Sequence, residues 1–287
     1  MKYFYPNYFY KKKTLKFINK TLNIRNYLLL KKKFIEKKEE FKNSIININN
    51  KEGFVFLNKK NALPENLLRN LENFCTERRI SEIQNENNDK NFMINLLKEN
   101  DVQKIDGLLD FSLNKNIVNI ASNYLNTIPF LAYIYLFYSF PNNSVNSSQL
   151  FHCDTEDDSQ LKLFFYLDDV DDNNGPFVFI PKNKSLEIMR KTKYQGKRLT
   201  DNQVYEHINR NEVIKFTGKK GSGLAIDTCG CLHYGSRENV KPRKLLMIQF
   251  TNHFASLYYK SELSNFIDLS SLDKDKLINC MPQKKIF

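Results

Sequence analysis

The sequence predicts a mainly β protein with flanking helices, whose short strands form a jelly roll or a related double sheet. After Pro129 the apolar pattern changes from helical spacing to short runs of β-branched and aromatic residues. Asn, Ser, Gly and Pro separate these runs, as turns separate the strands of a jelly roll. Hydrophobic residues make up 41% and aromatic residues 13% of the 287 residues, which is enough for a buried core and excludes wholesale disorder.

The first 50 residues form a basic extension. They contain 13 Lys and Arg against three Glu, so they hold most of the net charge of +12 and leave residues 51–287 nearly neutral. Lysine runs at 11–13 and 31–33 alternate with apolar clusters, which predicts a basic amphipathic helix ending near Asn43. Residues 1–45 could contact a membrane surface or pack on the flank of the barrel. We favour packing, because six aromatic residues between Tyr3 and Tyr10 would be costly to leave in water, and because an AT-rich genome also enriches lysine.

Helices and one strand are expected before the β region. Residues 53–57 have the composition of a short strand, and a helix begins at Pro64 with apolar residues at helical spacing up to Cys75. A second helix is predicted from about residue 105 to residue 125.

The β region is expected to contain seven strands and one insertion. The insertion at 182–212 has eight Lys and Arg and four acidic residues, which predicts a helical or mobile segment over one mouth of the barrel, too polar to join the core. The strands are predicted at about 130–140, 148–153, 161–170, 176–180, 213–217, 223–228 and 244–253. The resulting domain boundaries are a basic extension at 1–50, a β domain with N-terminal helices at 51–260 and a C-terminal extension at 261–287.

Charge and cysteine content exclude several classes of protein. The neutral body lacks the basic footprint of a nucleic-acid-binding domain, so no nucleic acid partner is expected. Five thinly spread cysteines do not resemble a disulfide framework and fit a reducing compartment. The longest apolar stretch, residues 128–140, is too short to span a bilayer, and no apolar signal core precedes Lys11. A soluble, cytoplasmic protein is therefore expected, while its oligomeric state is left open.

Three residues have the chemistry of a metal site. His152 and Asp154 are two positions apart, so on a strand their side chains point from the same face. His233 lies at the end of a later predicted strand. Two histidines and one carboxylate on one face of a metal leave the opposite face open, which is the geometry of non-haem Fe(II) oxygenases. Arg243 opens the next apolar strand and offers a guanidinium for a bidentate pair with a carboxylate.

Other interpretations of these and neighbouring residues are weaker. Cys229 and Cys231 lack the second cysteine pair that a structural zinc site needs. The acidic run 168–172 lacks the glycine and the twelfth-position acid of a calcium loop. His207 and His253 are expected to be ordinary surface or core residues. The acidic residues 156–158 are expected to form a solvated loop at the rim, and a buried Asp/His network in an inactive relative remains an alternative to a metal site.

The sequence resembles the phytanoyl-CoA dioxygenase family of Fe(II)/2-oxoglutarate oxygenases over about residues 50–255. The resemblance is carried by four segments, at 148–154 (SQLFHCD), 161–170 (LKLFFYLDDV), 174–177 (NGPF) and 227–236 (DTCGCLHYGS), together with Arg243. It departs from the family at 181–185, where Pro-Lys-Asn-Lys-Ser lacks the usual glycine and histidine.

The resemblance implies a cupin-like double-stranded β-helix and a complete set of cofactor contacts. Iron would be held by His152, Asp154 and His233, and the distal carboxylate of 2-oxoglutarate by Arg243. Gln149 and Ser236 stand where such enzymes often contact the cosubstrate.

The resemblance also implies a reaction. O2 and 2-oxoglutarate would be consumed in hydroxylating a small-molecule or carrier-borne metabolite, with release of succinate and CO2. Desaturation and ring formation remain open, whereas halogenation is disfavoured because Asp154 occupies its ligand position. The alternative is an inactive barrel that acts as a binding or scaffold protein through its basic tail.

Overall fold

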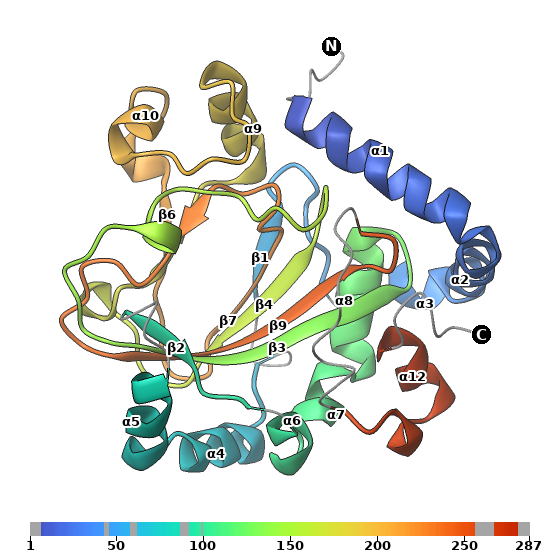
Figure 1. The fold of residues 1–287 in the computed structure, drawn as a ribbon, viewed down its shortest axis with the longest axis horizontal. Helices are drawn as coiled ribbons and strands as arrows, with labels where there is room; N and C mark the ends of the chain where they lie inside the picture. Colours follow the sequence, from blue (N-terminus) through green and yellow to red (C-terminus); the bar gives the residue numbers. More distant parts are fainter. Residues whose placement is uncertain are drawn as a thin grey trace.

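Two antiparallel sheets share one apolar core in the computed structural model, which describes residues 7–42, 46–57, 62–86, 92–98, 100–255 and 267–280 (Figure 1). The larger sheet has the strand order β1-β7-β4-β9-β3-β2, and the smaller sheet has the order β6-β5-β8. The strands are β1 Phe54–Leu57, β2 Met93–Asn95, β3 Pro129–Ser139, β4 Leu161–Tyr166, β5 Phe177–Phe179, β6 Ile214–Phe216, β7 Gly223–Ile226, β8 His233–Tyr234 and β9 Arg243–Asn252.

The path of the chain between the sheets is that of a jelly roll. From β3 onward, β3, β4, β7 and β9 lie in the larger sheet, and β5, β6 and β8 lie in the smaller one. Residues 151–152 extend the smaller sheet, because His152 forms an antiparallel bridge with His233 of β8. The chain therefore crosses repeatedly between two antiparallel sheets, and the predicted double-stranded β-helix with flanking helices is confirmed.

Strand β4 shows how the sequence divides the two faces of the larger sheet. Successive side chains of a strand point to opposite faces. Phe164 and Tyr166 belong to the cluster between the sheets, whereas Leu161, Leu163 and Phe165 belong to the cluster that the sheet shares with the helices. Lys162, two residues before Phe164, therefore points to the side of the sheet that faces the barrel interior.

Helices cover the outer face of the larger sheet. Helices α4 to α8 contribute apolar side chains to the core on that face, and α9 and α10 pack on Phe151 and Leu232. In the ribbon, α9 and α10 lie at the end of the barrel opposite α4 and α5 (Figure 1). The bounds are α4 Glu65–Phe74, α5 Glu77–Glu86, α6 Asp101–Lys104, α7 Leu108–Ser112, α8 Lys115–Leu125, α9 Lys182–Lys191 and α10 Asp201–Tyr205.

Two predicted elements differ from the structure. The single helix expected from 105 to 125 is divided into α7 and α8, because the Asn114 side chain caps a new helix by accepting a hydrogen bond from the Ile117 amide at 3.0 Å. The strand expected at 148–153 is a 3-10 turn at Ser147–Gln149 followed by isolated bridges. Helix α5 and strands β2 and β8 were not predicted, since α5 is polar and the two strands are only three and two residues long.

The insertion at 182–212 is helical, but the prediction that it is too polar for core is wrong. Its apolar residues face inward as a set, and Leu199 forms a bridge with Phe151. The buried residues of the segment are Ile188, Met189, Tyr194, Leu199, Val204 and Ile208. Lys191, Lys193 and Lys197 are exposed, so charged and apolar residues divide between the two sides of the segment and its average composition was misleading.

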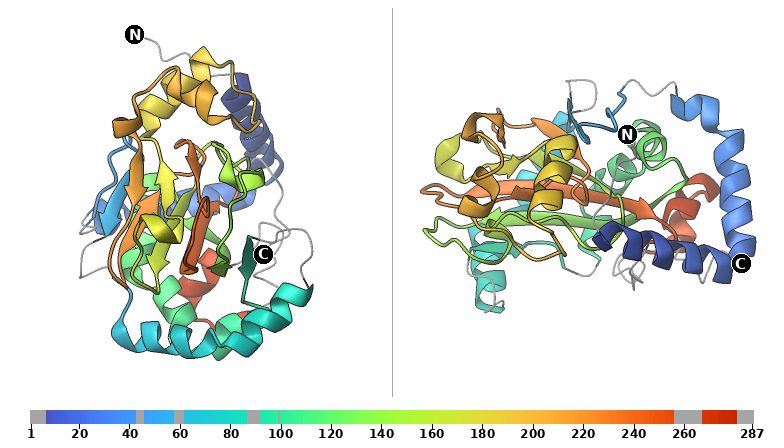
Figure 2. Two further views of the ribbon diagram at one scale, coloured as in Figure 1. Left: turned by 90° about the vertical axis from the view of Figure 1, so that its left-hand side faces the viewer. Right: turned by 90° about the horizontal axis from the view of Figure 1, so that it is seen from above.

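The basic extension packs beside the barrel, but it forms three helices where one was predicted, and Tyr10, which belongs to the aromatic group that favoured packing, is 52% exposed. It forms α1 (Asn7–Leu22), α2 (Ile24–Glu36) and α3 (Lys38–Lys42). Helices α2 and α3 lie beside the C-terminal helix α12 (Lys274–Cys280) (Figures 1 and 2). Leu30 and Phe41 are buried in one cluster with Ile128 and Phe254. Residues 1–6 and the predicted boundary at 260/261 lie outside the described residues. Within the described ranges, no helix is both long and apolar enough to cross a bilayer.

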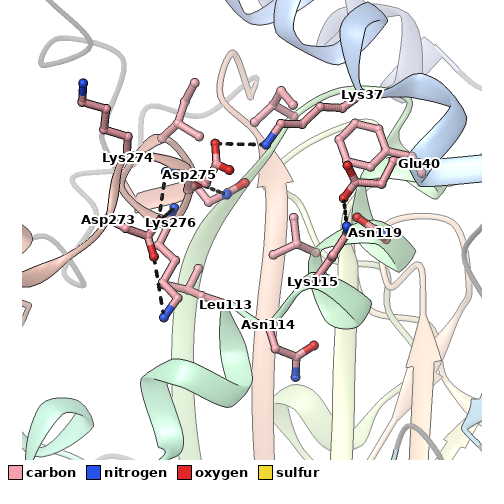
Figure 3. Close-up of a pocket in the computed structure, with 15 residues that line it drawn as sticks. Lys37, Glu40, Leu113, Asn114, Lys115, Asn119, Asp273, Lys274, Asp275 and Lys276 are labelled. Atoms are coloured by element: carbon pink, nitrogen blue, oxygen red, sulfur yellow. Dashed lines mark hydrogen bonds and ion pairs between the residues drawn. The ribbon is translucent and has the colours of Figure 1, made fainter.

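A pocket of about 620 Å³ lies between α3, α8 and α12 (Figure 3). Its rim carries charges that already pair with one another. Lys37 contacts Asp275 at 3.0 Å, and Lys115 contacts Glu40 at 3.0 Å. These pairs join the N-terminal extension to the rest of the molecule.

Candidate metal centre

The structure brings the three predicted ligands together. One donor atom from each of His152, Asp154 and His233 lies within 4.8 Å of the other two. The Asp154 Oδ1 atom is 4.0 Å from Nε2 of His152 and 3.8 Å from Nε2 of His233. Within the described ranges this is the one group of three such residues that could hold a metal ion.

Main-chain pairing positions the three residues. The His152 amide donates to the His233 carbonyl at 3.0 Å, and the His233 amide donates to the His152 carbonyl at 2.9 Å. The Asp154 amide donates to the Thr228 carbonyl at 2.9 Å. The two ends of the ligand set, far apart in the sequence, are therefore held by adjacent backbone segments of the smaller sheet.

Both histidines present the same ring nitrogen to the cluster. The Nδ1 atom of His152 lies 2.8 Å from the Leu150 carbonyl, and Nδ1 of His233 lies 2.9 Å from the Cys231 carbonyl. A carbonyl can only accept, so Nδ1 carries the proton and Nε2 offers its lone pair. Burial lowers the pKa of His152 and lowers that of His233 to about 3, which keeps both rings neutral, as metal binding requires.

The Asp154 carboxylate is oriented by two residues that the sequence analysis missed. Its Oδ2 atom accepts hydrogen bonds from Gln160 at 2.7 Å and from the Lys162 ammonium at 2.8 Å. Burial opposes ionisation, but the Lys162 ammonium, through its charge and its hydrogen bond, keeps the pKa of Asp154 well below its usual range. Oδ1 is thereby left facing the histidines. The sequence did show that Lys162 lies on the same side of the predicted strand as Phe164 and Tyr166.

Gln160 is itself fixed by its neighbours. Its amide also donates to Thr228 Oγ1 at 2.7 Å, and its carbonyl oxygen accepts from Gln249 at 3.0 Å. This network connects Asp154 to β7 and β9. Such outer partners commonly determine how a ligand carboxylate is presented to a metal.

Arg243 is a buried cation without an acidic partner among the described residues. The residue is only 2% exposed. Its guanidinium donates hydrogen bonds to the Gly175 carbonyl and to Ser236 Oγ, the latter at 2.8 Å. Nε has no hydrogen-bond partner. Burial lowers the pKa of Arg243, although Tyr166 opposes this effect. An uncompensated buried charge is costly, so this site favours an anionic ligand.

Phe177 lies between Arg243 and the three candidate metal ligands. The Phe177 ring centroid is 5.2 Å from that of His233. A Cβ atom built on Gly235 would lie 3.6 Å from Arg243 Nη2 and 3.7 Å from the Phe177 ring. The guanidinium and the histidines therefore border the same part of the barrel interior.

Ser236 and Gln149 have different relations to this site. Ser236 is buried, has φ = +58°, and contacts both Arg243 and Ser139 through its hydroxyl. The side-chain amide of Gln149 forms hydrogen bonds with four residues, namely Asn142, Ser144, Asn146 and Ser236. It holds the turn beside Ser236, and direct contact of either residue with a cosubstrate remains a prediction.

Asp227 holds the turn that leads to His233. Its side chain is fully buried and accepts from the amides of Cys229 and Gly230 at 3.1 and 3.2 Å. Its other oxygen accepts from Tyr124 and from Lys182, each at 2.7 Å. Lys182 belongs to the segment where the sequence departs from the resembled family, so here this segment supports the turn through an ion pair.

Helix α1 contacts the loop that begins at Asp154. The Lys12 ammonium donates to the main-chain carbonyls of Asp154 at 3.1 Å and Asp157 at 2.7 Å. Lys16 pairs with Asp157 at 3.0 Å and with Asp158 at 2.6 Å. The prediction that residues 156–158 form a solvated loop is therefore wrong, because α1 covers Asp157 completely.

The remaining candidates take no part in the cluster. His253 is buried against Phe130, and His207 is half-buried outside the group. Burial raises the pKa of both the Cys229 and the Cys231 thiol well above the ordinary value, which disfavours the thiolate that zinc requires. In the acidic run 168–172, Asp168, Asp169, Asp171 and Asp172 each pair with a lysine.

No family model and no curated protein matches this chain. Among solved structures, AviO1 from Streptomyces viridochromogenes is 16% identical over 72% of this chain and 92% of its own, with a TM-score of 0.48. EctD from S. alaskensis is 13% identical over 71% of this chain and 74% of its own, with a TM-score of 0.49. The epimerase SnoN, in complex with Fe3+, alpha ketoglutarate and nogalamycin RO, is 13% identical over 81% and 91%, with a TM-score of 0.47. At such low similarity, the function of this chain has to be inferred from its own site.

Proposed function

We propose that the protein is an Fe(II)- and 2-oxoglutarate-dependent oxygenase that hydroxylates a small-molecule or carrier-borne metabolite. The observation that supports this proposal is the combination of a His-Asp-His cluster with the buried guanidinium of Arg243, which has no acidic partner among the described residues, in one barrel. The cluster suits a divalent metal, and the guanidinium suits a carboxylate.

The three ligands fit iron in number and chemistry. Two neutral imidazole nitrogens and one carboxylate oxygen form the donor set of the open triads that hold non-haem Fe(II). The Nε2 atoms of His152 and His233 and Oδ1 of Asp154 would hold the ion. When bound, iron supplies the chemistry that activates O2.

Arg243 would hold the distal carboxylate of 2-oxoglutarate. Ser236 fixes the guanidinium through its hydroxyl, and the Tyr166 side chain also interacts with it, so the arginine is already oriented before a ligand arrives. A carboxylate would supply the missing counter-charge. Charge-assisted pairs of this kind are strong where water is excluded.

The overall reaction would convert substrate, O2 and 2-oxoglutarate into hydroxylated product, succinate and CO2. Hydroxylation is the simplest outcome for this site, while desaturation or ring formation would use the same residues. The alternative, an inactive barrel that serves as a scaffold, requires the ligand set and Arg243 to be retained without use.

Binding and turnover can be measured separately. Anaerobic equilibrium dialysis should show one Fe(II) bound per chain and binding of labelled 2-oxoglutarate that depends on Arg243. Succinate release coupled to O2 uptake should follow under air, and His207→Ala should serve as a control that changes neither. Tight binding of both ligands without succinate release, even with candidate substrates, would favour the scaffold. Failure to retain any divalent metal would contradict the proposal.

A further inference from the structure

The N-terminal helices expose an unusual amount of apolar surface. Eight of the eleven large apolar side chains that are exposed in the described part of the chain lie on α1 and α2. We define these eight as the outward apolar face. Its members are Tyr10, Leu15, Phe17, Ile18, Leu22, Ile24, Leu28 and Ile35. Single exposed apolar residues are common, but a concentration on two adjacent helices indicates an interaction surface.

Helix α1 packs on the protein with its polar face. Lys12, Lys16 and Asn19 follow the i, i+4, i+7 spacing of one helix face, and each bonds to the body of the protein. Phe17 is 68% exposed and Leu22 is 75% exposed. The usual arrangement, with apolar residues inside and lysines in water, is therefore reversed in this helix.

Helix α2 has an inner apolar face and a second one directed outward. Leu30 is buried, with Tyr27 and Phe34 packed in the same cluster. Ile24, Leu28 and Ile35, spaced at i, i+4 and i+11, are 50%, 55% and 60% exposed. The exposed stripe is thus additional to the residues that attach the helix.

The charge around this face selects the kind of partner. Residues 7–42 contain 12 Lys and Arg and three Glu. Lys11, Lys13, Arg25, Lys31 and Lys32 are exposed beside the apolar residues. A second copy of the chain would bring like charges together, which is costly. An anionic lipid surface supplies both an apolar phase for the side chains and negative headgroups for the lysines.

We propose that the outward apolar face of α1 and α2 binds the surface of an anionic membrane while the polar face of α1 stays attached to the barrel. Packing and membrane contact, which the sequence analysis treated as alternatives, use different faces of the same helix. Because Lys12 contacts the carbonyl of Asp154, the membrane would lie against the helix that covers the metal-ligand loop. The proposal does not depend on which reaction the site performs.

Co-sedimentation of the full chain with lipid vesicles tests this surface. The protein should sediment with mixed phosphatidylcholine and phosphatidylserine vesicles at low salt and much less with phosphatidylcholine alone. Binding should weaken in about 1 M salt, where the Debye length is about 3 Å. The double variant Phe17→Ser/Leu22→Ser should lower partitioning at least about tenfold, since each side chain loses its burial in lipid. Val240→Ser removes a side chain that is 66% exposed elsewhere and should change nothing.

A second variant and a second measurement complete the test. Lys11→Glu/Lys32→Glu should weaken binding to anionic vesicles at least about tenfold while leaving the apolar residues in place. Equal binding to neutral vesicles, or equal binding by the Phe17→Ser/Leu22→Ser variant, would overturn the proposal. So would sedimentation-velocity data that show a dimer dissociated by that variant in a protein that ignores vesicles, because the face would then join two copies.

Discussion

The ammonium group of Lys12 donates a hydrogen bond to the main-chain carbonyl of Asp154, a residue 142 positions away in the sequence. The same ammonium donates to the Asp157 carbonyl, and it is almost completely buried. The N-terminal extension therefore reaches the backbone of a candidate metal ligand.

Replacing Lys12 with Met is expected to weaken metal binding. The variant loses two charge-assisted hydrogen bonds and leaves two carbonyls without this donor, so the Asp154 loop becomes less well fixed. Loss of an outer partner of this kind typically lowers metal affinity about 10- to 100-fold. Equilibrium dialysis with Fe(II) measures the change, and Lys11→Met on the exposed side of the helix is the matched control. Identical affinities for the two variants would show that the loop holds its position without the helix.

Deletion of residues 1–45 is expected to lower the melting temperature. The deletion removes Leu30 and Phe41 from their cluster with Phe254 and exposes Asp157, whose carboxylate is paired with Lys16. Full burial of each apolar side chain contributes about 1.5–3 kcal/mol. Differential scanning calorimetry of the metal-free protein measures the difference. An unchanged melting temperature would contradict this account of packing.

Asp154→Ala is expected to abolish turnover and metal binding and also to destabilise the protein. Lys162, buried beside Asp154, would lose its counter-charge, and breaking a buried pair typically costs about 3–5 kcal/mol. The double variant Asp154→Ala/Lys162→Met should recover stability in urea titrations without recovering metal binding. Wild-type turnover in Asp154→Ala would remove this residue from the ligand set. If the double variant were as unstable as the single one, the pair would not be the cause.

Arg243→Ala is expected to raise the 2-oxoglutarate concentration needed for half-maximal turnover far more than it changes Fe(II) binding. Losing one partner of a buried charge pair costs about 2–5 kcal/mol, which corresponds to roughly 30-fold to several thousand-fold in affinity. For Arg243→Lys this concentration should lie between those of wild type and Arg243→Ala, because lysine keeps the charge but not the bidentate geometry. An unaltered 2-oxoglutarate requirement would assign Arg243 a purely structural role.

The metal-free protein is expected to lose stability as the pH falls from about 6.5 to about 4. The pKa of His233 is lowered to about 3 by burial, so the unfolded chain, with an ordinary histidine, takes up a proton in this range and the folded chain does not. The contribution of one such histidine is about 1.4 kcal/mol per pH unit. Asp157, whose pKa burial raises to about 6, opposes this trend. The Asp157 contribution is the same in wild type and in His233→Gln, so it cancels when the two are compared. The free energy of unfolding should depend less on pH in His233→Gln than in wild type. Parallel slopes would contradict a neutral His233.

The sequence predicted the ligands because each lies in a short local pattern. His152 and Asp154 share one segment, and Arg243 begins the last long strand. His233 begins the short strand β8, where the end of a strand was predicted, and the jelly roll brings the three ligands together. The contact of Lys12 could not be predicted, because it joins distant segments through a reversed helix face. Lys162 was missed for another reason: the sequence shows that it has the same alternation as the inward residues of the strand, but not that Asp154 is its partner.

The pairing of His152 with His233 has a consequence for the order in which the protein matures. During synthesis, His152 and Asp154 leave the ribosome before His233 has been made, and the edge on which His152 pairs is then incomplete. Helix α1 is synthesised earlier still, yet the carbonyls that its Lys12 contacts, those of Asp154 and Asp157, belong to the same incomplete region. Completion of the candidate metal site therefore requires the strand that begins at His233, and a nascent chain stalled before that residue would carry only two of the three candidate ligands.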